Sequence, residues 1–137
     1  MTATTRNGFV DAYHSSRLSH LAGTTYPSAP SNTYIGIYSA LPLSDGTGGT
    51  EISPATRPGI TLGSVVTDAT GRQYVTHAAA INNIALTNTS ACEIVGYGLH
   101  SASSGSTLIF VLPCYPHQVQ PGASISLTAG TLKFYSD

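Results

Sequence analysis

The stretch Thr33–Ile52, TYIGIYSALPLSDGTGGTEI, decides the fold that we predict for this chain. Its first half alternates between two kinds of side chain, with Tyr34, Gly36 and Tyr38 on one side and Ile35 and Ile37 on the other. A β-strand separates its two faces with a period of two residues, so a strand is expected here. Pro42 lacks a backbone donor and should end that strand. The segment Ser44–Glu51 (SDGTGGTE) has no apolar residue, which predicts a long mobile or docking loop.

Short apolar segments follow this loop, separated by turn signals roughly every ten residues. The strands expected after the first one are residues 59–66, 73–77, 81–86, 92–100, 107–112, 123–127 and 131–135. Gly63 predicts a bulge or break within its strand, and Pro113 should end the strand before it. Residues 107–112 (TLIFVL) are continuously apolar, so both faces of this strand should be covered. The rhythm predicts an all-β fold, an antiparallel two-sheet β-sandwich or jelly roll.

The N-terminal part of the chain has the period of a helix instead. Thr4 or Thr5 could cap a helix that runs to about Ala22, and Gly23 would stop it. Four side chains recur at four-residue spacing and form one amphipathic face: Phe9, Tyr13, Arg17 and Leu21. We therefore expect one domain, residues 1–137, with an N-terminal helical arm over residues 1–23 that lies outside the sandwich.

The composition is unusual in its charge. Asp, Glu, Lys and Arg make up 8% of the 137 residues, against about 25% in a typical soluble protein. The hydrophobic fraction of 41% is sufficient for a core. A surface of Ser, Thr, Asn, Gly and Tyr loses little ionic hydration when it docks. Such a surface is typical of a protein that is permanently bound to other proteins.

Charge and hydropathy also restrict which binding partners and which cellular compartment are expected. Five scattered basic residues provide no basic patch, so we expect no direct nucleic-acid partner. No apolar run approaches the ~20 residues that span a bilayer, and the N-terminus has no signal-peptide core. The chain is therefore expected to be made in a cytoplasm, with Cys92 and Cys114 as reduced thiols.

The sequence offers only weak candidates for chemistry. Asp11, His14 and Ser15 or Ser16 could form a triad on the helix, but no nucleophile-turn motif is present. The strand-end histidines His77, His100 and His117 lack zinc-ligand spacing and are expected at the surface or at an edge. Asp45 and Glu51 share a loop and could bind Ca²⁺ loosely, although no EF-hand pattern is present. We expect no enzyme activity, no cofactor and no metal.

The order of motifs along most of the chain resembles a family of small tailed-phage virion proteins, which includes head decoration (cement) proteins and related minor structural proteins. The likeness rests on a helical N-terminus, then TYIGIY, a proline and DGTGGTE, followed by residues 95–102 (VGYGLHSA), 105–112 (GSTLIFVL) and 121–132 (PGASISLTAGTL). The resemblance implies a β-sandwich or jelly roll that binds an assembled shell and has no catalytic site.

Two functions of different class follow. The first is a head decoration protein on the outside of the capsid in the virion, synthesised in the bacterial host cytoplasm. It would stabilise the shell by bridging neighbouring copies of the major capsid protein and would associate with itself in a homodimer or other symmetric oligomer. The alternative is a tail- or fibre-associated module that recognises a receptor or glycan. No membrane contact is expected, and the proposed subunit or capsid interface comprises Phe9, Tyr13, Arg17, Leu21, Asp45 and Glu51.

Overall fold

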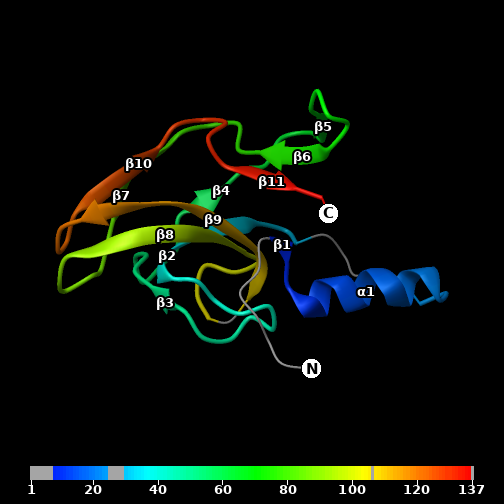
Figure 1. Cartoon of the computed structure of the whole chain (residues 1–137), viewed down its shortest axis with the longest axis horizontal. Coiled ribbons are helices and arrows are strands. Elements are labelled where there is room, and N and C mark those ends of the chain that lie inside the picture. The colour runs from blue at the N-terminus through cyan, green and yellow to red at the C-terminus, as the bar shows by residue number, and fades with distance from the viewer. Residues whose placement is uncertain (1–7, 25–29, 106, 137) are drawn as a thin grey trace.

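The computed structural model describes residues 8–24, 30–105 and 107–136 (Figure 1). Its largest sheet has the strand order β1–β9–β8–β2–β3, and β4 also pairs with β2. The bounds are β1 (Gly8–Phe9), β2 (Thr33–Ala40), β3 (Thr50–Glu51), β4 (Gly59–Ile60), β8 (Cys92–His100) and β9 (Leu108–Val119). Every pairing in this sheet is antiparallel. Strands β9, β8 and β2 are therefore the interior strands of this sheet, because each has neighbours on both sides.

Two smaller antiparallel sheets complete the fold. One pairs β7 (Ile81–Ala85) with β10 (Ser124–Leu127), and the other has the order β11–β6–β5. Its strands are β5 (Val66–Thr67), β6 (Gln73–Thr76) and β11 (Lys133–Tyr135). Figure 1 shows β10, β6 and β11 in a layer above the large sheet. One hydrophobic cluster joins the layers, with members such as Ile35, Ile84, Phe110, Leu127 and Phe134. The prediction of an antiparallel all-β sandwich with a short helix is confirmed.

The alternation in β2 places its side chains as predicted. Ile35 and Ile37 are fully buried in the core between the layers, and Tyr38 lies on the opposite, outer face of the sheet. The strand ends at Ala40, two residues before Pro42. In the predicted strand 59–66, Gly63 does mark a break: only Gly59–Ile60 and the residues from Val66 onward pair as strands.

Strand β9 corrects the expectation that Pro113 ends the strand. The strand continues to Val119 because its ladder with β8 contains a bulge: Gly96 pairs with Pro113, whereas Ile94 pairs with His117. Three residues of β9 thus lie opposite the single residue Val95. Pro113 lies at the edge of this bulge, where the backbone donor that proline lacks is not required. Tyr115, at the centre of this bulge, is 95% exposed.

The same bulge shifts the register of β8. Ile94 is in the core, and after the bulge Tyr97 and Leu99 are there too, so the core-facing positions change from even to odd numbers. The period-two alternation expected of a strand at residues 92–100 therefore does not hold beyond Ile94. The cause is the unpaired length on β9, which the sequence of β8 alone does not contain.

The helix begins later than predicted. Helix α1 is Asp11–Leu21, because Gly8 and Phe9 pair with β9 instead of continuing the helix. Its N-cap is the extended residue Val10, which provides no side-chain cap; the predicted caps Thr4 and Thr5 lie outside the described residues. None of the residues of α1 is buried, and Figure 1 shows the helix projecting from one end of the sheets. The short helix is thus present, but the part of the predicted arm at Gly8–Phe9 belongs to the large sheet.

Candidate functional site

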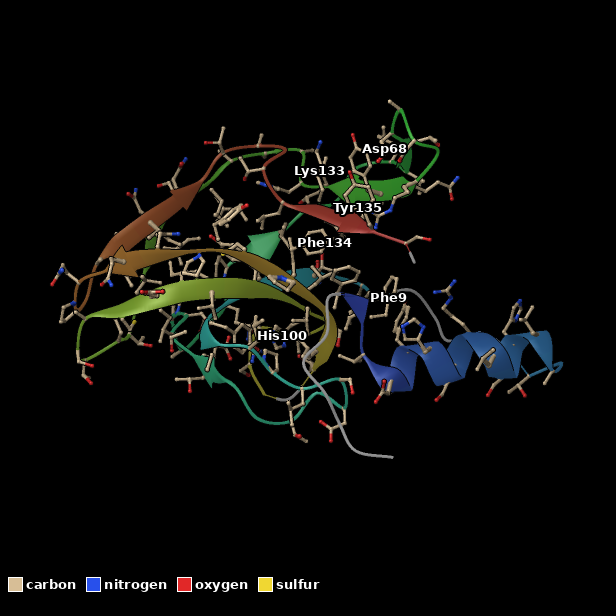
Figure 2. All side chains as sticks on the ribbon, viewed as in Figure 1. Phe9, Asp68, His100, Lys133, Phe134 and Tyr135 are labelled. Atoms are coloured by element: carbon tan, nitrogen blue, oxygen red, sulfur yellow. The ribbon has the colours of Figure 1, made fainter. Side chains whose placement is uncertain are left out.

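Five polar side chains gather on the outer face of the large sheet, opposite the core, and we call them the outer-face cluster: Tyr38, Glu51, Ser53, Arg57 and His100 (His100 is labelled in Figure 2). Strand β2 supplies Tyr38, and β8 supplies His100. Glu51 comes from β3, and Ser53 and Arg57 come from the segment after it. The cluster therefore connects three strands of the sheet with a loop.

Two glycines make room for this cluster. A Cβ atom on Gly36 would lie 2.8 Å from Glu51 Oε2, and a Cβ on Gly98 would lie 2.7 Å from Tyr38 Cε2. Gly36 and Gly98 are partners in the β2–β8 ladder. The paired glycines thus form a shallow floor on which the Tyr38 ring lies, and any larger residue at either position would displace it.

Arg57 is the most connected member of the cluster. Its Nε and Nη2 donate to Glu51 Oε2 and Oε1 at 2.7 and 2.9 Å, which is a bidentate ion pair. Nη1 and Nη2 also donate to the backbone carbonyls of Ala102 and Gly105 at 3.2 and 2.8 Å. Arg57 is only 7% exposed. This one side chain therefore holds the loop between β8 and β9 against β3.

The acid of this pair is held in its ionised form. Burial alone would raise the pKa of Glu51, but hydrogen bonds from Arg57 and Ser53, together with the charge of Arg57, outweigh it and lower that pKa. The hydrogen bond to Glu51 in turn raises the pKa of Arg57. Both groups are consequently charged at neutral pH and engaged with each other.

His100 is held neutral in the same cluster. Its Nε2 and the Tyr38 hydroxyl form a hydrogen bond of 2.8 Å, and the two rings are nearly parallel with centroids 6.2 Å apart. Burial, and secondarily the charge of Arg57, lowers the pKa of His100 to about 4. Burial likewise raises the pKa of Tyr38. The cluster thus joins two neutral rings to an ion pair, which is an arrangement suited to stabilising a sheet face.

Two of the histidines expected at the surface or at an edge are buried, which corrects that prediction. His77 is 1% exposed and His100 is 2% exposed, whereas His117 is exposed as expected. His77 accepts a hydrogen bond from the Leu132 backbone at Nε2 and lies 3.0 Å from the Ala79 carbonyl through Nδ1. The signal missed in the sequence is strand pairing, which covers these side chains with segments far away in the chain.

The glycine-rich loop is less free than predicted. Asp45 Oδ1 accepts hydrogen bonds from the backbone and hydroxyl of Thr47 at 2.9 and 2.6 Å. Ser44 is buried, and its carbonyl accepts a hydrogen bond from Asp11 at the start of α1. Glu51 belongs to β3 and faces Arg57, so it is not part of an outward-facing loop with Asp45. The two carboxylates proposed for Ca²⁺ are thus engaged separately by protein groups.

The predicted interface residues of the N-terminal arm come together only in part. Phe9 stacks on Tyr13 with ring centroids 4.9 Å apart, and the Arg17 guanidinium lies 5.8 Å from the Phe9 centroid. Phe9 reaches this position from β1, not from the helix, and also packs against Phe110 of β9. Leu21, in contrast, is 83% exposed at the far end of α1, and Leu18 is 67% exposed. Whether these residues contact a partner stays a prediction.

An apolar groove of about 430 Å³ lies beside the root of the helix. Its lining comes from β1, α1, β6, β9 and β11 and from the segment before β5, and includes Phe9, Tyr13, Leu62, Val65, Phe110 and Phe134. In Figure 2, Phe134 of β11 lies above Phe9 at the helix root. No charged side chain is among the described residues that line the groove. The sequence did not predict it, because several segments that are far apart in the chain must meet to form it.

Both cysteines are free thiols, Cys92 on β8 and Cys114 in the bulge of β9. The Cys114 thiol lies 3.8 Å from the Ile94 carbonyl oxygen, and burial raises the pKa of this thiol. Among the residues that the structure describes, no three His, Cys, Asp or Glu side chains are grouped as metal ligands would be.

Acid should destabilise the protein through His100. Its ordinary pKa of about 6.5 applies in the unfolded chain, whereas its folded pKa is about 4. As the pH falls from 6.5 to 4, the unfolded chain binds a proton that the folded protein excludes, so the free energy of unfolding should fall by about 3 kcal/mol. Urea unfolding at a series of pH values measures this loss. His100→Gln should flatten the curve over that interval, and an unchanged slope in this variant would contradict the assignment.

Removal of divalent cations should have no effect. Thr47 engages Asp45, and Arg57 engages Glu51, so neither carboxylate depends on a cation for a partner. We expect the melting temperature after dialysis against EDTA to equal that of the untreated protein. A fall that added Ca²⁺ reverses would instead reveal a cation site.

The family model described as podophage GP4 fiber I protein gp80 matches residues 8–135. A search of curated proteins finds no match to the sequence. In the described part of the chain, no helix is both long enough and apolar enough to cross a membrane.

Proposed function

Because the chain belongs to the podophage GP4 fiber I protein gp80 family, we propose that it is a structural module of a phage fibre, which docks against other subunits of that fibre. The single observation that carries the proposal is the family match, which extends over residues 8–135 and hence over α1 and every strand. The chain is accordingly a phage virion structural protein, and the resemblance to small virion proteins of tailed phages is correct at that level.

The expectation of a head decoration protein has less support, because the description of the matched family names a fibre protein and not a capsid protein. The alternative drawn from the sequence, a tail- or fibre-associated module, now becomes the leading function. The predicted partner changes with it, from the major capsid protein to fibre subunits, which include further copies of this chain. Recognition of a receptor or glycan by the module remains part of the same proposal.

The surface of the protein supports a docking role. Charged residues make up 8% of the sequence, and in the outer-face cluster Glu51, which is partly buried, pairs with the buried Arg57. The remaining surface has few ionic groups, so extensive contacts with neighbouring protein cost little desolvation free energy. Helix α1 adds an arm that extends from the sheets and exposes two leucines.

We also propose that the protein has no catalytic activity. The polar side chains that lie closest together, those of the outer-face cluster, use their hydrogen-bonding groups on one another. A general acid or base at neutral pH needs a pKa near 7, whereas burial moves the pKa of His100 and that of Tyr38 away from this range. These features favour a role in stability.

Particles that lack the protein test this proposal. In a phage whose gene for this chain carries an early stop codon, we expect heads that package DNA and survive heating like the parent, and tails with missing or shortened fibres. Adsorption to host cells should fall, and expression of the intact chain from a plasmid should restore it. Normal fibres and adsorption combined with heat-sensitive heads would overturn the proposal in favour of head decoration.

A further inference from the structure

We draw no further inference here: the strongest candidate, the surface patch on the sheet of β5, β6 and β11 where Arg72 lies over the ring of Tyr135 and Lys133 over the ring of Tyr74, carries nothing, because these side chains already contact one another and nothing in the structure shows what covers them.

Discussion

Phe110→Ala is expected to lower the free energy of unfolding by about 3–5 kcal/mol, the range for deletion of a large aromatic side chain from a core. Phe110 is 1% exposed and sits where the layers of the sandwich meet. Its ring packs edge-on against Phe9 of β1 and Phe134 of β11, with centroids 5.0 and 5.4 Å away. The substitution would leave a cavity between the large sheet and the sheet of β11, and would loosen the root of α1 as well.

Chemical denaturation followed by circular dichroism measures this effect. Tyr115→Ala is the matched control, because Tyr115 is an aromatic residue of the same strand but is 95% exposed. The control should change the free energy of unfolding by no more than about 0.5 kcal/mol. Equal losses for the two variants would mean that Phe110 does not occupy the core position described here.

Arg57→Met is expected to cost at most about 3 kcal/mol of unfolding free energy, the lower end of the range for removing one partner of a buried ion pair, because the Glu51 side chain that remains is 27% exposed. The variant leaves Glu51 without its bidentate partner and frees the carbonyls of Ala102 and Gly105. The loop between β8 and β9 would lose its attachment to β3. We expect faster hydrogen exchange in that loop as well as the lower stability.

The double variant Glu51→Gln with Arg57→Met is the control for this prediction. It removes both charges and therefore should be more stable than Arg57→Met alone, since no unpaired carboxylate remains. Unfolding in urea at neutral pH compares the parent, the two single variants and the double variant. If the two single losses simply add in the double variant, then the pair does not interact as the structure describes.

The sequence predicted those parts of the fold that depend on local pattern. The alternation of isoleucine with tyrosine and glycine in β2 identified both the strand and its buried face, because the period of a strand is a local property. The bounds of β8 were correct to the residue, and the run TLIFVL is buried over Ile109, Phe110 and Val111. The strands predicted at residues 123–127 and 131–135 contain β10 and β11.

The sequence did not reveal features that arise where distant segments meet. Pro113 looked like a strand end, but the extra length of β9 opposite Val95 allows the ladder to continue. Phe9 has the spacing of the helical face with Tyr13, but pairing with Phe110 draws it into β1. In each case a tertiary contact overrides the local preference.

The candidate site was predicted in outline only. Leu21 was identified as a contact residue from its helical spacing, and the structure does leave it exposed at the end of the arm. The neighbouring Leu18 belongs to the same apolar surface, yet it lies outside the row of four-residue spacing that was chosen. The groove and the outer-face cluster were missed because each combines residues from three or more separate segments, such as Tyr38, Arg57 and His100.

Cryo-electron microscopy of the intact virion tests the central claim most directly, because it locates the protein itself. The β-sandwich with its projecting helix has a shape that can be fitted into a map of sufficient detail, and an antibody fragment against an exposed epitope on the purified chain confirms the identity of the density. We predict that the protein occupies the fibres, in several copies per fibre. Density for it on the outer surface of the capsid, with none in the fibres, would contradict the account.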